Sequence, residues 1–165
     1  VGITMTLPMD IRLASNKAKI GFVFARRGLA PEAGAASFLP RIVGLPQALR
    51  WCYSGRVFGA EEALAGGLVS EVTEPDDLLP RAVAIAREIA DETSAISIAV
   101  TRALLWRFSD EADPLKVLGV DGALAMAMGG TADVKEGVAA FLEKRKPNFP
   151  GKVSTDMPDV YPWWA

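Results

Sequence analysis

The spacing of apolar residues changes near residue 77 of this 165-residue chain. Before that point, short apolar runs alternate with short amphipathic segments and glycines, and alternation of strands with helices indicates an α/β layer. From Asp77 onward, apolar residues recur at intervals of three and four, which is typical of helices with one apolar face. The pattern therefore predicts an α/β part over residues 1–77 and a helical region over residues 78–165.

Individual elements follow from the same patterns and from turn residues. Residues 11–14, 18–22 and 68–72 are predicted as strands, the first two separated by the turn pair Ser15–Asn16. Gly55 and the Gly66–Gly67 pair are expected to end two of the helices, and Thr131 is a favourable N-cap for the last one. The predicted helices cover residues 31–39, 46–53, 60–65, 78–90, 94–108, 114–128 and 131–145.

The helical region is too apolar to remain fully exposed, so we expect it to pack on the α/β part or on another subunit. Residues 157–164 combine prolines with Tyr161, Trp163 and Trp164. Disorder would leave three aromatic rings in water, so this segment is predicted to be an ordered strap on a hydrophobic surface.

Composition excludes several kinds of site. The chain has no histidine, which rules out Ser-His and Cys-His nucleophiles and histidine-containing metal sites within it. A net charge of −2 gives no basic surface for nucleic acid, and no apolar run is long enough for a membrane span. The single cysteine, Cys52, cannot form an internal disulfide. Together with the lack of a signal-peptide pattern at residues 1–9, it leads us to expect a cytoplasmic protein.

The most informative stretch is residues 28–34, GLAPEAG. Proline is favoured at the first position of a helix, so a helix is predicted to begin at Pro31 with Glu32 in its first turn. A carboxylate near free backbone N–H groups stays ionised, as a proton-abstracting base requires. Acids at this position also stabilise ordinary helices, and position alone favours that second interpretation.

Several segments resemble the crotonase, or enoyl-CoA hydratase/isomerase, superfamily. Residues 10–15 (DIRLAS) are similar to the family segment D-I-R-x-A-S, and residues 28–44 are similar to its G-L-x-P-x-x-G and L-P-R-x-V-G block. Residues 54–69 contain counterparts of T-G-R, A-x-E-A and G-L-V, and residues 136–145 resemble the closing E-G-x-x-A-F-L-E-K-R. The segments occur in family order and cover nearly the whole chain.

The resemblance implies a partial crotonase-like spiral of strand–strand–helix turns over residues 1–77, followed by helices that drive assembly into a homotrimer or hexamer. It implies an acyl-CoA thioester substrate of fatty-acid metabolism and an enolate-like intermediate whose oxyanion is held by two backbone N–H groups. No metal or redox cofactor is implied, because coenzyme A arrives as part of the substrate.

The family is longer than this chain at the N-terminus, so part of the site would lie before Val1. By the resemblance, one oxyanion donor is a backbone N–H at Val1–Gly2. Hydratases of the family use two glutamates, and Thr4 and Phe24 stand at their positions. Glu32 matches the single catalytic glutamate of the Δ3,Δ2-enoyl-CoA isomerases, which raises it to the favoured base.

The resemblance therefore favours double-bond isomerisation of an enoyl-CoA. The alternatives are an enoyl-CoA hydratase, a non-catalytic acyl-CoA-binding module and an oligomerising fragment. Candidates for contacts with substrate or coenzyme A are Phe24, Arg26, Phe141 and Lys144. Arg26 could instead be part of a structural or solvated charge pair, and Phe141 and Lys144 could simply pack the last helix. Arg12 is expected to hold a turn through hydrogen bonds.

Overall fold

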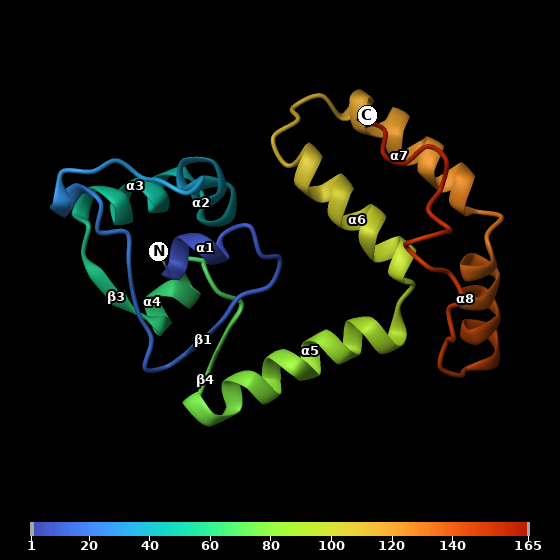
Figure 1. Ribbon diagram of the computed structural model, residues 1–165, viewed down its shortest axis with the longest axis horizontal. Coiled ribbons are helices and arrows are strands. Elements are labelled where there is room, and N and C mark those ends of the chain that lie inside the picture. The colour runs from blue at the N-terminus through green and yellow to red at the C-terminus, as the bar shows by residue number, and fades with distance from the viewer. Residues whose placement is uncertain (1, 165) are drawn as a thin grey trace. The chain divides into compact units, whose positions relative to one another are not determined.

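The computed structural model describes residues 2–164, which divide into two compact units (Figure 1). The first unit runs to Ala84 and the second begins at Ile85, so the division lies inside the long helix α5 (Leu78–Glu92). That helix begins where the sequence pattern changes from mixed to helical. Strands occur only in the first unit among the described residues, as predicted for an α/β part followed by helices.

The first unit combines short strands with short helices. Gly55 adopts a left-handed conformation with φ of 53° and closes one helix, as predicted, by donating its N–H to the carbonyl of Trp51. The helices predicted at 46–53 and 60–65 are confirmed. The elements are α1 (Gly2–Thr6), β1 (Leu13–Ser15), β2 (Lys19–Gly21), η1 (Ala25–Arg27), α2 (Ala35–Val43), α3 (Leu45–Ser54), β3 (Val57–Gly59), α4 (Ala60–Ala65), β4 (Glu71–Thr73) and η2 (Pro75–Asp77).

The strands form two separate two-stranded sheets. β1 pairs in parallel with β4, placing Ala14 opposite Val72, while β2 pairs antiparallel with β3, placing Ile20 opposite Phe58. A parallel pair needs a long crossover connection, and the chain between β1 and β4 supplies it with helices. The strand predicted at 18–22 is present but shorter. Those predicted at 11–14 and 68–72 are shorter and displaced toward the C-terminus, so that Ser15, predicted in a turn, ends β1. β3 was not predicted.

The core of the first unit is built around Trp51, which is fully buried. Its ring stacks on Phe58 at 4.4 Å between centroids and on Phe22 at 6.1 Å. The indole Nε1–H donates to Glu62 at 2.8 Å, and Glu62 also pairs with Arg56. The polar edge of the buried ring is therefore satisfied by a half-buried carboxylate at the margin of the core.

All the regular secondary structure in the described part of the second unit is helical. It contains most of α5, α6 (Ala95–Phe108), α7 (Pro114–Met128) and α8 (Ala132–Glu143). Ser94, Asp113 and Thr131 cap the last three helices, each side chain accepting a backbone N–H from the first turn. The N-cap prediction for Thr131 is confirmed, and the last helix ends at Glu143 rather than at residue 145.

The C-terminal segment packs on the core of the second unit. Ile96, Val100 and Leu124 are buried there, and Met157, Tyr161 and Trp163 pack against them. Figure 1 shows this segment, in red, returning along α7. Trp163 also stacks on Phe108 of α6 with ring centroids 6.0 Å apart. The aromatic residues thus cover apolar surface on the helices.

Between residues 2 and 164, no single helix combines the length and the apolar character of a membrane span. The pair α7 and α8, bent by 77°, satisfies both criteria only when its members are taken together.

Candidate functional site

The loop of residues 28–34 corrects the prediction of a helix beginning at Pro31. Ala33 and Gly34 both have positive φ angles, 52° and 73°, and helix α2 begins only at Ala35. Two successive left-handed residues cannot belong to a right-handed helix, so they separate Pro31 and Glu32 from it. The interpretation of Glu32 as an acid in the first turn of a helix is therefore wrong.

Glu32 lies instead in an exposed loop. Its backbone carbonyl accepts the N–H of Ala35 at 3.0 Å, which joins the loop to the start of α2. Its carboxylate has no hydrogen-bond or ion-pair partner among residues 2–164. A base must be free to accept a proton, and Glu32 meets that condition in this part of the chain.

An apolar cavity of about 360 Å³ lies beside this loop. Pro31 forms part of the cavity wall, and Glu32 is the next residue in the chain. A concave apolar site of this size is typical of small-molecule binding. The cavity is lined by Phe24, Ala25, Leu29, Pro31, Ala35, Ala36, Leu39, Pro40, Leu45, Ala48, Leu49, Cys52 and Tyr53.

Two predicted contact residues lie near this cavity. Phe24 is half-buried, packs against the core of the first unit and lines the cavity wall. Arg26 is exposed, and its Nε–H donates to the carbonyl of Ser54 at 2.8 Å. This contact is a hydrogen bond to a backbone carbonyl and not a charge pair, so both the charge-pair interpretation of Arg26 and its role toward coenzyme A stay predictions.

The predicted oxyanion donors fall at the start of α1. Val1 lies outside the described residues, and Gly2 is the exposed first residue of the helix. Thr4, which stands at the position of a hydratase glutamate, is buried with 3% of its surface exposed. The two hydratase positions in this chain therefore carry a buried hydroxyl and an apolar ring.

Arg12 fixes the segment that follows α1, as expected. Its Nε–H donates to the carbonyl of Leu68 at 2.8 Å, and Nη1 donates to those of Leu7 at 3.3 Å and Met9 at 2.5 Å. Burial lowers the pKa of Arg12, and nearby Asp10 opposes that effect. One guanidinium thereby ties the chain after α1 to the chain before β4.

Phe141 and Lys144 lie in the second unit, at the end of α8. Phe141 is 82% exposed, and Lys144 is exposed with φ of 54°. The ammonium of Lys144 has no ion-pair partner in the described part of the chain. An exposed aromatic ring and an unpaired cation thus lie one helical turn apart.

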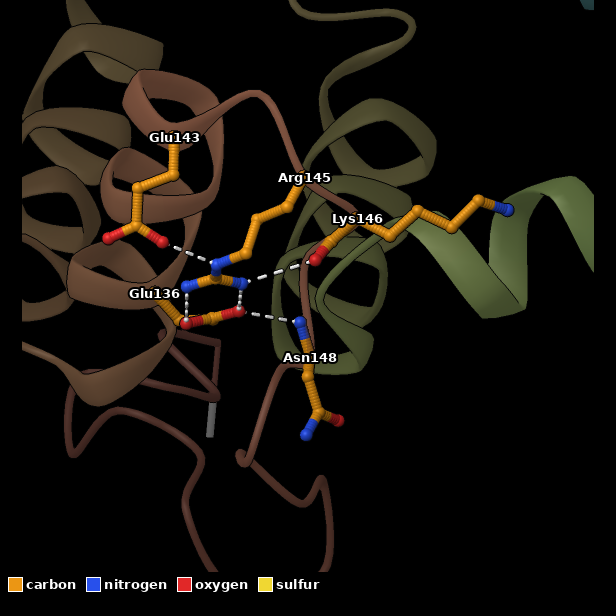
Figure 2. Close-up of polar contacts among 5 residues, drawn as sticks. All are labelled: Glu136, Glu143, Arg145, Lys146 and Asn148. Carbon is orange, nitrogen blue, oxygen red and sulfur yellow. Dashed lines mark hydrogen bonds and ion pairs between the residues drawn. The ribbon is translucent and has the colours of Figure 1, made fainter.

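Next to Lys144, Arg145 joins the carboxylates of two glutamates (Figure 2). Its Nη1 and Nη2 donate to the two oxygens of Glu136 at 2.6 and 3.0 Å, and its Nε donates to Glu143 at 2.6 Å. The N–H of Asn148 reaches Glu136 at 2.7 Å. The guanidinium and the Asn148 N–H lower the pKa of Glu136 from 4.5 to about 2.

Because its pKa is lowered on folding, Glu136 contributes stability above its ordinary pKa of 4.5, and this contribution is lost as the pH falls toward about 2. Glu136→Gln is therefore expected to reduce stability at neutral pH, with the difference from the unaltered chain shrinking across that window. Urea unfolding at a series of pH values measures it. Glu88→Gln, which alters an exposed acid of α5, is the control. A difference that does not depend on pH would contradict the prediction.

Among residues 2–164, no group of three or more histidine, cysteine, aspartate or glutamate side chains is arranged to hold a metal ion. In the first unit Phe24 and Pro31 line the apolar cavity and Glu32 follows Pro31 in the chain, while the second unit carries Phe141 and Lys144. The helical residues of the cavity wall were not predicted as a set. The sequence signal that could have found these residues is the apolar face that each of the helices α2 and α3 carries.

Comparison with known proteins identifies the family to which this chain belongs. The model of the family described as enoyl-CoA hydratase/isomerase matches residues 1–152. The chain belongs to the enoyl-CoA hydratase/isomerase family. Within this family, the chain is 43% identical over 150 residues to enoyl-CoA hydratase AKT3-2 of Alternaria alternata, covering 90% of this chain and 50% of that protein.

Two further relatives show the range of the family. The chain is 32% identical over 159 residues to the 1,2-epoxyphenylacetyl-CoA isomerase of Escherichia coli, covering 92% of this chain and 57% of that protein. Its fold is similar to the crystal structure of a probable enoyl-CoA hydratase/isomerase from Mycobacterium abscessus, with a TM-score of 0.87 at 30% identity, over 92% of this chain and 61% of that one. The predicted crotonase-like fold is thereby confirmed.

The chain spans about half the length of the curated relatives it matches: 50% of the Alternaria alternata hydratase and 57% of the Escherichia coli isomerase. The match ends at residue 152, so the aromatic C-terminal segment lies beyond it.

Proposed function

We propose that the full-length protein is an enoyl-CoA hydratase, which adds water to a 2-enoyl-CoA thioester. The observation that carries this proposal is the 43% identity to an enoyl-CoA hydratase over 90% of the chain. Two further proteins named enoyl-CoA hydratases are 41% and 42% identical over the same length. These relatives support hydration more strongly than the isomerisation that the sequence motifs favoured.

In this proposal Glu32 is the base. Its carboxylate takes a proton from water while the water oxygen forms a bond to C3 of the substrate. The electron pair of the double bond then moves onto the thioester, giving an enolate held by the backbone N–H groups of Val1–Gly2 and of a donor outside this chain. The carboxylic acid of Glu32 returns the proton at C2, which completes the addition of water.

The rest of the substrate is assigned to the remaining candidates. The apolar cavity beside the loop, with Phe24 in its wall, accepts the acyl chain because burial of methylene groups is favourable there. Phe141 and Lys144 offer an exposed ring and a cation to the coenzyme A portion. The apolar helices of the second unit are proposed to assemble into a homotrimer or hexamer.

Isomerisation is the second candidate, and one observation favours it. Thr4 is buried and Phe24 is apolar, so neither hydratase position offers a carboxylate to orient water. A single base is sufficient for a double-bond shift, because Glu32 can remove a proton from C2 of a 3-enoyl-CoA and return it at C4.

Incubation of the full-length protein with 2-enoyl-CoA and, separately, with 3-enoyl-CoA decides between the two. Hydration predicts loss of the 2-enoyl absorbance and formation of a 3-hydroxyacyl-CoA. Appearance of the conjugated 2-enoyl thioester from the 3-enoyl substrate, with no hydroxyacyl product from either, would support the isomerase instead. Binding of both thioesters without turnover would contradict both reactions.

A further inference from the structure

The backbone at the end of α8 has an unusual conformation at Lys144. A φ of 54° is left-handed, a region that residues with a β-carbon rarely adopt and that glycine usually fills at this position. The N–H of Lys144 still donates to the carbonyl of Phe141 at 3.3 Å, and that of Arg145 donates to Ala140 at 3.1 Å. Such conformations persist where surrounding contacts fix them.

A cluster of polar contacts centred on the next residue, Arg145, surrounds this helix end, as Figure 2 shows. The two bonds to Glu136 tie the guanidinium to a residue two turns earlier in α8. A further bond from Nη1 to the carbonyl of Lys146, at 3.1 Å, holds the residue that follows. Lys144 therefore lies between two restrained segments. The last turn of α8 precedes it, and it is followed by Arg145, which is bonded to Glu136, and by Lys146, whose carbonyl is bonded to Arg145.

The same contacts decide which positive charge remains available. Arg145 is neutralised by Glu136 and Glu143, and the ammonium of Lys146 lies 3.4 Å from Glu92. Of these three consecutive cations, Lys144 alone has no ion-pair partner among residues 2–164. The cluster thus leaves one exposed ammonium on a fixed backbone.

We propose that Glu136 is a positioning residue that acts through Arg145 to hold Lys144 for contact with a phosphate group of the acyl-CoA. This inference rests on the proposed assignment of Lys144 to the coenzyme A portion. Glu136 itself does not touch the substrate. Its bidentate pairing with Arg145 sets the backbone of Lys144, and it also prevents the guanidinium of Arg145 from competing for the same phosphate.

Binding of coenzyme A and of pantetheine to the full-length protein, measured by calorimetry, tests this. Pantetheine lacks the adenosine and its phosphates, so a contact to phosphate affects only coenzyme A. Lys144→Ala and Glu136→Gln are each expected to raise the Kd for coenzyme A by about threefold to tenfold, which is typical of one lost charged contact. The Kd for pantetheine should stay the same in both variants.

The double variant separates positioning from independent effects. If Glu136 acts through Lys144, the combined variant should bind coenzyme A no more weakly than Lys144→Ala alone. Glu88→Gln, a change of the same chemical type on α5, should alter neither Kd. Two results would overturn the proposal. One is a Kd increase in the double variant equal to the product of the increases in the single variants. The other is an equal increase in the Kd values for coenzyme A and pantetheine in Glu136→Gln.

Two further outcomes are distinguishable. Should Glu136→Gln fail to fold, Arg145→Lys retains the cation without the bidentate geometry and is expected to give the same selective loss for coenzyme A. An unchanged Kd in Lys144→Ala would overturn both the assignment of Lys144 and the role of Glu136. Since the readout is binding, absence of enoyl-CoA turnover would count against the proposed reaction alone.

Discussion

Replacing Glu32 with glutamine is expected to lower kcat of the full-length protein by about 10²–10⁴-fold, the usual contribution of a general base. Glutamine keeps the size of the side chain and its place in the exposed loop but cannot accept the proton. Because the carboxylate has no partner among residues 2–164, its removal breaks no contact there. The loss should therefore appear in kcat, with little change in substrate affinity or in thermal stability.

Glu61→Gln provides the matched control, since Glu61 is another exposed acid of the first unit. Its steady-state parameters should equal those of the unaltered protein. The same loss is expected whether hydration or isomerisation is followed, because Glu32 is the base in both. An unchanged kcat in Glu32→Gln would show that Glu32 is not the base.

Trp51→Ala is expected to destabilise the first unit by about 3–5 kcal/mol, the range for truncating a buried aromatic residue. The indole is fully buried and stacked on Phe58, and its Nε1–H is bonded to Glu62. Truncation leaves a cavity and removes that donor. Chemical denaturation followed by circular dichroism measures the loss, and Trp51→Phe, which keeps a ring, should lose less.

A second substitution identifies the packing as the cause. A β-carbon added at Gly66 would lie 2.6 Å from the Trp51 ring, so Gly66→Ala should also be destabilising. In the Trp51→Ala background that clash is gone, and the cost of Gly66→Ala should largely disappear. Additive losses would show that Gly66 acts through its backbone rather than through contact with Trp51.

Much of the fold was predictable because its helices carry local signals. Thr131 and Gly55 mark a beginning and an end, and the intervals of three and four locate the helices between residues 78 and 143. β3 was missed because it offers only two adjacent apolar residues, Val57 and Phe58, whereas the other strands lie in or beside longer apolar runs. Its identity depends on pairing with β2, which is a tertiary contact.

The candidate site was predictable in its residues but less so in its geometry. Proline at position 31 is compatible with a helix, yet the start of α2 is decided by the left-handed conformation of Ala33, which nothing local in the sequence requires. The cavity needs the relative placement of α2 and α3. The pairing of Glu136 with Arg145 joins residues across a helix end, where regular spacing gives no guidance.

Asp133 fixes the chain just before the aromatic C-terminal segment. Its buried carboxylate accepts the hydroxyl of Ser94 at 2.5 Å and the N–H of Gly151 at 2.8 Å. A β-carbon at Gly151 would lie 2.6 Å from Ile96, so this anchor requires the small residue. The family match ends at residue 152, directly after the anchor. Because Gly151 is bonded to α8, the aromatic segment beyond it is a short tether with a fixed starting point, which lowers the entropy cost of packing Tyr161 and Trp163 on the helices.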